Sequence, residues 1–99
     1  MSSTSTPPTK STQPVFIALQ ANNDTMLLID AIKGDNPHAE VIESPAMVRI
    51  VAPGRLVIRR ESVEELIGRS FDLREIQLNT ISIGGEVDET EDEFVLFWQ

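Results

Sequence analysis

Short apolar runs alternate with polar turns along the first half of the chain. The spacing of the apolar positions predicts a strand, a helix and two more strands, over residues 15–20, 25–33, 39–44 and 46–52. Asn23 or Asp24 suits the N-cap of the helix, because its side-chain oxygen can accept a backbone N–H of the first turn. Gly34 is typical of the position that ends a helix. The first half therefore reads as strand, helix, strand, strand.

The second half repeats this order. Its predicted strand, helix and two further strands lie over residues 56–60, 62–67, 78–83 and 94–98. The turn dipeptide Pro53-Gly54 separates residues 46–52 from 56–60. We expect the three strands over residues 39–44, 46–52 and 56–60 to form a meander. The predicted fold class is α+β: one small domain of two strand-helix-strand-strand units, with largely antiparallel sheets and two to three short helices.

Two pairs of residues in the second half have the spacing of a capping box, in which the side chains at the first and fourth positions accept each other's backbone N–H. Ser62 with Glu65 predicts the start of the helix, and Gly68 its end. Asp72 with Glu75 repeats the spacing. We therefore expect one more helical turn after Asp72.

The N-terminal segment differs in composition from the rest of the chain. Residues 1–14 are rich in serine, threonine and proline and contain no apolar residue after Met1. Such a segment buries too little apolar surface to offset the entropy of ordering it. We expect a disordered tail over residues 1–14 and a folded domain over residues 15–99.

The composition excludes several classes of chemistry. The 99-residue chain has no cysteine and one histidine, which rules out disulfides, thiolate metal sites, thiol nucleophiles and three-histidine zinc sites. A net charge of −8 opposes binding to nucleic acid and to anionic lipid. No apolar stretch approaches the roughly 20 residues that span a bilayer. We therefore expect a soluble cytoplasmic protein without a nucleic-acid or membrane partner.

An acidic run, EVDETEDE, occupies residues 86–93. Two of its carboxylates could act as the acid and base of a hydrolase if a dry cleft separated their pKa values. Asp88, Thr90 and Asp92 also match the first ligands of a calcium loop, but Glu93 stands where that loop requires glycine. A charge run of this kind is usually a solvated loop, which is the interpretation we favour.

Four arginines lie in a stretch that contains no acidic residue, and they predict a basic patch on an acidic protein: Arg49, Arg55, Arg59 and Arg60. The patch could dock an acidic partner or a phosphate. No aromatic residue is interleaved with the arginines, so the stacking platform of single-strand binders is missing. The alternative is a solvated strand face.

Three other features have plain structural interpretations. His38 follows Pro37 in a turn and is expected to be a surface group. Trp98 could anchor a partner, but a terminal apolar strand normally packs into the core, which we favour. Gly84-Gly85 lacks the spacing of a nucleotide-binding loop and indicates a bulge or turn.

Taken together, the ordered residues resemble the small effector, or coupling, proteins of bacterial multicomponent diiron monooxygenases, most closely the regulatory component of phenol hydroxylases. The resemblance covers about residues 15–99. It rests on the segments DNPHAEV (35–41), AMVRI (46–50), RLVIRRESVEELIGRSFD (55–72) and LNTISIGGEV (78–87).

The resemblance implies a protein that has no metal, cofactor or catalytic residue and that binds the diiron hydroxylase, altering substrate and oxygen access and turnover. It implies hydroxylase contacts by Asn79, Thr80, Ile81, Ser82, Ile83, Gly84 and Gly85. The methane monooxygenase relative has small hydroxyl residues where this chain has Ile81 and Ile83, and this departure favours an aromatic substrate. Two alternatives stay open: a generic acidic interaction adaptor, and the carboxylate hydrolase described above.

Overall fold

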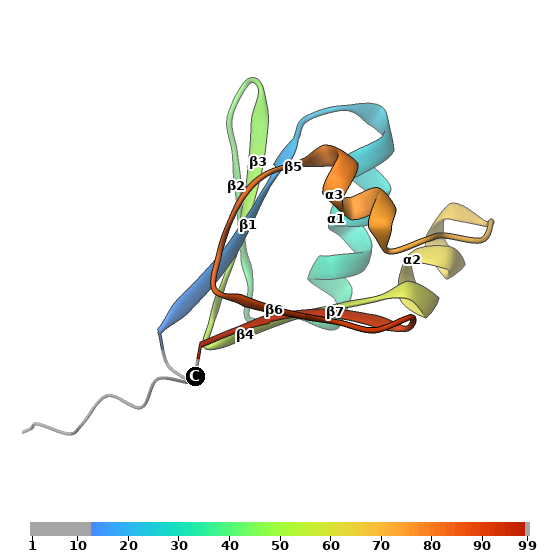
Figure 1. The fold of residues 1–99 in the computed structure, drawn as a ribbon. Helices are drawn as coiled ribbons and strands as arrows, with labels where there is room; N and C mark the ends of the chain where they lie inside the picture. Colours follow the sequence, from blue (N-terminus) through green and yellow to red (C-terminus); the bar gives the residue numbers. More distant parts are fainter. Residues whose placement is uncertain (1–12, 99) are drawn as a thin grey trace, which may run out of the picture.

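The computed structural model describes residues 13–98 and contains two antiparallel sheets with three helices between and beside them (Figure 1). The strands are β1 (Pro14–Gln20), β2 (Glu40–Glu43), β3 (Met47–Pro53), β4 (Arg55–Arg59), β5 (Thr80–Gly84), β6 (Glu86–Glu89) and β7 (Glu93–Phe97). The helices are α1 (Asn23–Asp35), α2 (Arg60–Ile67) and α3 (Arg74–Asn79). The expected α+β class with antiparallel sheets and short helices is confirmed.

The two sheets do not correspond to the two halves of the sequence. The four-stranded sheet has the order β2-β3-β1-β5, and the three-stranded sheet the order β4-β7-β6. The second predicted unit thus contains two helices and an additional strand, and its strand β5 joins the sheet of the first unit. The predicted meander over residues 39–60 is right for its first two strands, because β2 pairs antiparallel with β3. It is wrong for the third, because β4 lies in the other sheet.

The chain passes directly from the four-stranded sheet to the three-stranded sheet twice, each time at a glycine with positive φ, and it returns once through α2 and α3. Gly54 joins β3 to β4 with φ of 76°, and Gly85 joins β5 to β6 with φ of 131°. Figure 1 shows both passages at the same corner of the molecule. Backbone with positive φ is open to glycine without the steric cost that a Cβ brings. The interpretation of Gly84-Gly85 as a turn is confirmed.

Both ends of the domain meet at this corner. The Gly54 N–H donates to the Gln13 carbonyl at 2.8 Å, and the Trp98 indole N–H donates to the Pro14 carbonyl at 2.9 Å. Trp98 is 36% exposed, so its predicted place in the core is wrong. Gln13 and Pro14 belong to this arrangement, whereas the remainder of the expected tail lies outside the described residues.

The core fills the space between the sheets and helices. Val15, Ile17 and Leu19 alternate along β1 and are completely buried, as the period of two along a strand requires. They pack with residues of α1, β4 and β7, of which the largest are Ile32, Leu56, Ile58 and Leu96. Complete burial of each such side chain contributes about 1.5–3 kcal/mol. Within residues 13–98, no helix is both long and apolar enough to cross a membrane.

Helix α1 begins one residue before the predicted caps. Its N-cap is Asn22, whose Oδ1 accepts the Thr25 N–H at 3.0 Å, while Thr25 Oγ1 accepts the Asn22 N–H at 3.1 Å. Thr25 is fully buried and also donates its hydroxyl to the Gln20 carbonyl at 2.7 Å. This second bond ties the first turn of the helix to the end of β1. It explains why the N-cap is Asn22 and not Asn23 or Asp24.

The other end of α1 is set by Asn36. The helix runs through Gly34, which was predicted to end it, and its C-cap is Asn36. Asn36 Oδ1 accepts the Val57 N–H at 2.9 Å, and its Nδ2 donates to the carbonyls of Val57 and Ile32, each at 2.7 Å. One side chain thus pairs with the edge of β4 as a neighbouring strand would, and this fixes α1 against the three-stranded sheet.

The start of α2 differs from the prediction. The helix begins at Arg60, directly after β4, and its N-cap Arg59 makes no side-chain capping bond. The Arg60 N–H donates to the Asp92 carbonyl at 2.9 Å, so a tertiary contact replaces the expected cap at Ser62. Gly68 is the left-handed C-cap with φ of 75°, which confirms that part of the prediction.

Replacing Asn36 by alanine removes all three of its side-chain hydrogen bonds. We expect a loss of about 2 kcal/mol in the free energy of unfolding, because part-buried Val57 backbone groups are left unsatisfied. Urea unfolding followed by circular dichroism measures the change. His38→Ala, at an exposed position in the same connection, is the control and should change stability by less than about 0.5 kcal/mol. Equal stability of Asn36→Ala and wild type would contradict the role of this side chain.

Candidate functional site

The segment that the family resemblance singles out, residues 79–85, spans three kinds of local structure. Asn79 ends α3, Thr80–Gly84 is strand β5, and Gly85 is the corner residue. The strand predicted from residue 78 therefore starts at Thr80. The reason is the confirmed helical turn after Asp72, which continues into α3 and ends where Thr80 Oγ1 donates to the Ile76 carbonyl at 2.7 Å.

Strand β5 is an edge strand, and its side chains reach solvent. Ile81 is 50% exposed and Ile83 39% exposed, and Ser82 between them is also exposed. The pairing with β1 shifts register at Ile81, because Ala18 pairs with Ser82 and Leu19 with Thr80. A bulge of this kind re-aims the extra side chain. The segment therefore presents two large apolar side chains on an uncharged strand.

Asn79 is held by a contact with α1. Asn22 Nδ2 donates to Asn79 Oδ1 at 3.2 Å and so joins the N-cap of α1 to the end of α3. Residues far apart in the sequence are thereby fixed next to each other at the start of β5. Asn79 is thus already positioned by Asn22 in the free protein. The resemblance implies, in addition, that it contacts the hydroxylase.

Gly84 has a different role from Gly85. A Cβ at Gly84 would lie 2.2 Å from Cε1 of Phe16, so the phenyl ring lies directly against this glycine. The Arg49 guanidinium lies over the same ring, 5.3 Å from its centroid, in a cation–π contact. Phe16 was not among the predicted site residues. No local signal connects it with Gly84, because only the pairing of β1 with β5 brings them together.

The four arginines are not gathered into one patch. Arg49 lies on β3 of the four-stranded sheet, whereas Arg55 and Arg59 lie at opposite ends of β4 in the other sheet. Arg59 pairs with Glu93 at 3.7 Å. Arg60 pairs with Asp92 at 3.0 Å and approaches Glu64 at 3.9 Å. Acidic residues of the 86–93 run and of α2 therefore offset two of the four charges.

The acidic run is not the solvated loop that we expected. Its first half is strand β6, which pairs with β7 from Glu86 opposite Phe97 to Glu89 opposite Phe94. Every residue of β6 is exposed, so the dry cleft that a carboxylate hydrolase requires is not formed there. Within the described part of the chain, no cluster of three or more histidine and acidic residues could hold a metal ion. His38 is exposed, as expected.

The sequence profile of the MmoB/DmpM family matches residues 13–97. The chain belongs to this family. It is 52% identical, over 86% of its length and 94% of the relative, to the stimulatory component DmpM of phenol 2-monooxygenase from Pseudomonas sp. (strain CF600).

Solved structures agree with this membership. A chain in a structure of the phenol hydroxylase–regulatory protein complex matches with a TM-score of 0.85 at 50% identity, covering 88% of this chain and 100% of that one. Regulatory protein B of soluble methane monooxygenase matches with a TM-score of 0.70 at 17% identity, covering 98% and 71%. The latter shows a shared fold.

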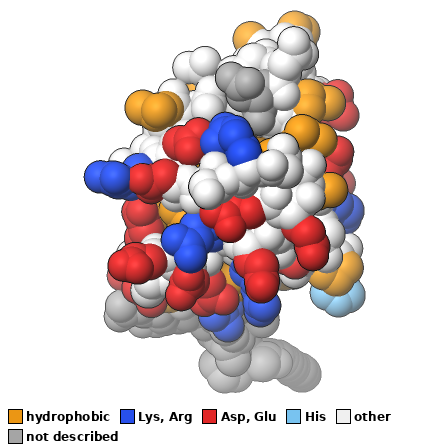
Figure 2. Space-filling model, turned by 90° about the vertical axis from the view of Figure 1, so that its right-hand side faces the viewer, with side chains coloured by type: hydrophobic (Ala, Val, Ile, Leu, Met, Phe, Trp, Pro, Cys, Tyr) orange, Lys and Arg blue, Asp and Glu red, His pale blue; other side chains and the backbone are white. Residues whose placement is uncertain are grey.

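This MmoB/DmpM family member also has a broad hollow of about 1060 Å³, which residues 79–85 do not line. It is lined by Arg60, Glu64, residues 70–75 and residues 89–91. Figure 2 shows the corresponding face, on which acidic and basic side chains are interspersed. Because charges of both signs are mixed on this face, it creates no electrostatic potential of a single sign that would attract a charged ligand.

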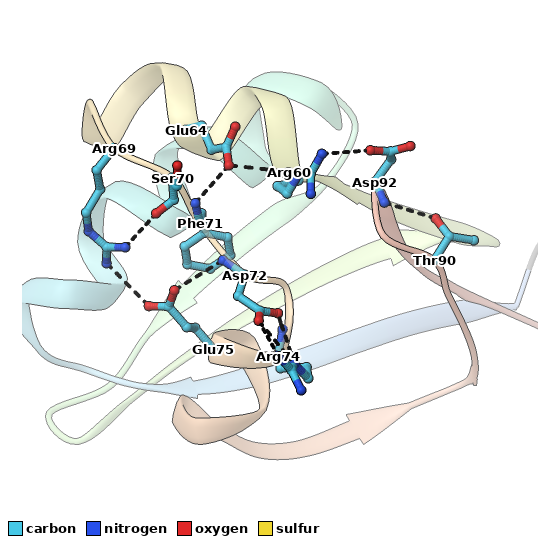
Figure 3. A network of polar contacts seen from close by, with 10 residues as sticks. All are labelled: Arg60, Glu64, Arg69, Ser70, Phe71, Asp72, Arg74, Glu75, Thr90 and Asp92. Atoms are coloured by element: carbon cyan, nitrogen blue, oxygen red, sulfur yellow. Dashed lines mark hydrogen bonds and ion pairs between the residues drawn. The ribbon is translucent and has the colours of Figure 1, made fainter.

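A network of polar contacts spans this hollow (Figure 3). Glu64 accepts the Phe71 N–H at 2.8 Å, Arg69 pairs with Glu75 at 3.3 Å, and Arg74 pairs with Asp72 at 2.7 Å. These contacts brace the segment between α2 and α3. We interpret the hollow as a structural brace and not as a ligand site.

The same contacts shift the pKa values of two carboxyl groups. Hydrogen bonds from the Arg74 side chain and backbone lower the pKa of Asp72 to about 2. The pKa of Glu75 is lowered by the Asp72 N–H and then by the Arg69 guanidinium. Asp72 in turn raises the pKa of Arg74. Both carboxylates favour the folded state while they are ionised.

Asp72→Asn keeps an oxygen for the Arg74 N–H but removes the charge. Because folding depresses the pKa of Asp72, its stabilising contribution is complete above the ordinary value of 3.8 and is lost as the pH falls to about 2. We expect wild type to have a higher Tm than the variant near neutral pH, and this difference to vanish at about pH 2. Thermal unfolding across this range measures it, with Asp30→Asn on the exposed side of α1 as the control. A pH-independent difference would contradict the assignment.

Proposed function

We propose that this chain is the regulatory component of a multicomponent phenol, or aromatic, hydroxylase. It performs no reaction itself and holds no cofactor; it binds the diiron hydroxylase in the cytoplasm and modulates substrate and oxygen access and turnover. The observation that carries the proposal is the 52% identity, across nearly the whole relative, to a protein named as the stimulatory component of phenol 2-monooxygenase. The solved phenol hydroxylase–regulatory protein complex supports the same partner.

The contact surface of the proposal is the segment from Asn79 to Gly85. The exposed Ile81 and Ile83 support this assignment, because apolar side chains on an uncharged edge strand gain free energy when a partner covers them. A regulatory protein changes the partner's conformational equilibrium only through different affinities for its states. The hydroxylase state competent for turnover is therefore the one that this segment binds more tightly.

The arginines form a second, weaker part of the proposed contact. Two of the four arginines form no ion pair within residues 13–98. They are Arg49, which lies over Phe16 on the four-stranded sheet, and Arg55 at the start of β4. Attraction of these charges to an acidic hydroxylase surface would make association sensitive to salt.

The test is a titration of this chain into a purified diiron phenol hydroxylase and its reductase. We expect phenol hydroxylation to rise steeply and to reach a plateau near one equivalent, because the chain acts as a stoichiometric partner. An unrelated acidic protein of similar size serves as the control. No response with a cognate hydroxylase would contradict the proposal and leave the generic adaptor as the remaining interpretation.

Ile81→Ala and Ile83→Ala test the contact segment. Each truncates a partly exposed apolar side chain, so we expect a change in unfolding no larger than that of the control below. We expect a roughly tenfold increase in the concentration that gives half-maximal activity, equivalent to about 1.4 kcal/mol. The matched control is Ile42→Ala, because Ile42 is 43% exposed on the opposite edge strand β2. Unchanged stimulation by both variants would show that the segment does not touch the hydroxylase.

A further inference from the structure

Strands β5 and β6 are one stretch of chain bent at the Gly84-Gly85 corner. Each is an edge strand, β5 of the four-stranded sheet and β6 of the three-stranded sheet. Figure 1 shows that the two strands run along the same side of the molecule, where the sheets diverge from the corner. The exposed edges of the two sheets are therefore continuous through this corner.

The pairing register of β5 with β1 and of β6 with β7 shows which side chains of the two edge strands face the core. Ile83 pairs with Ile17, and Val87 pairs with Leu96. Directly paired residues in a sheet present their side chains on the same face. Ile17 and Leu96 are completely buried core residues, so Ile83 and Val87 point to the core side of their sheets.

These two side chains nonetheless remain open to solvent. Ile83 is 39% exposed and Val87 is 43% exposed. Two residues beyond Val87, the strand is tied to α3, where Gln77 donates to Glu89 of β6 at 3.1 Å. The result is an apolar margin of the core, defined by Ile83 and Val87, next to the exposed Ile81.

The β5 half of this margin lacks the charges that commonly protect an edge strand, whereas the β6 half carries Glu86, Asp88 and Glu89. The opposite edge strand, β2, carries Glu40 and Glu43, whereas Thr80–Gly84 contains no charged residue. Natural edge strands are commonly blunted by charges, and an uncharged apolar edge indicates a surface that a partner covers. The margin is continuous through one peptide corner with the proposed hydroxylase contact.

We propose that Val87 extends the hydroxylase-contact surface from β5 onto β6, so that Ile83 and Val87 together receive an apolar part of the hydroxylase surface. This inference rests on the proposed function and adds to it a contact outside the segment from Asn79 to Gly85. The charged neighbours Glu86, Asp88 and Glu89 then lie at the rim of the contact, where polar residues are typical of interfaces.

Val87→Lys tests this extension against Ile42→Lys, because Val87 and Ile42 are both 43% exposed on edge strands. A lysine is tolerated at an exposed edge, so we expect both variants to fold with wild-type Tm values. In the hydroxylation titration, Val87→Lys should raise the half-saturating concentration about tenfold or more, and Ile42→Lys by less than about twofold. Val87→Ile, which keeps the apolar surface, should have a half-saturating concentration close to that of wild type.

The outcomes separate this inference from the proposed function. A higher half-saturating concentration for Ile83→Lys but not for Val87→Lys would overturn the proposed contact at Val87 and leave the regulatory function standing. Failure of the wild-type chain to stimulate any cognate hydroxylase would overturn both. Sedimentation velocity of the free chain is the further check: a dimer that Val87→Lys dissociates would assign the margin to a second copy and overturn the inference.

Discussion

The two glycine passages at one corner are the constraint on which the architecture depends. Gly54 and Gly85 both have positive φ, and at each of them the chain leaves the four-stranded sheet for the three-stranded one. Because the sheets are joined at this corner, they diverge from it, and the helices close the space between them (Figure 1). The Trp98–Pro14 hydrogen bond holds the two ends of the domain at the same place.

The same constraint determines where the molecule is open. The passage at Gly85 makes β5 and β6 consecutive edge strands, so their core-facing side chains lie at the margin of the interior. Elsewhere specific polar contacts join neighbouring elements, such as the pairing of Asn36 with Val57 and the hydrogen bond that the Phe71 N–H donates to the Glu64 carboxylate. The uncharged edge strand β5 thus contrasts with the edge strands β2 and β6, which carry acidic residues.

The candidate site was only partly predictable from the residues. The segment from Asn79 to Gly85 was identified by resemblance, and the glycine turn by local chemistry. Phe16, which lies against Gly84 and under Arg49, had no local signal, because β1 and β5 are far apart in the sequence. The local signal for Val87 was weak. The alternation of Glu86, Val87 and Asp88 is typical of a strand, but the high charge of the run favoured the interpretation as a loop.

The sequence by itself determined the kinds of element, the α+β class and the exclusion of cysteine chemistry, because these depend on composition and on spacing within a few residues. The family was identified from the resemblance of longer segments, and not from composition or spacing. Tertiary structure decided which strands share a sheet and that Asn22 and Asn36 cap the two ends of α1. It also decided that Trp98 lies at the surface and that the arginines are dispersed. These features arise from contacts between segments distant along the chain. The energies of such contacts depend on long-range pairing and burial, and local periodicity does not encode them.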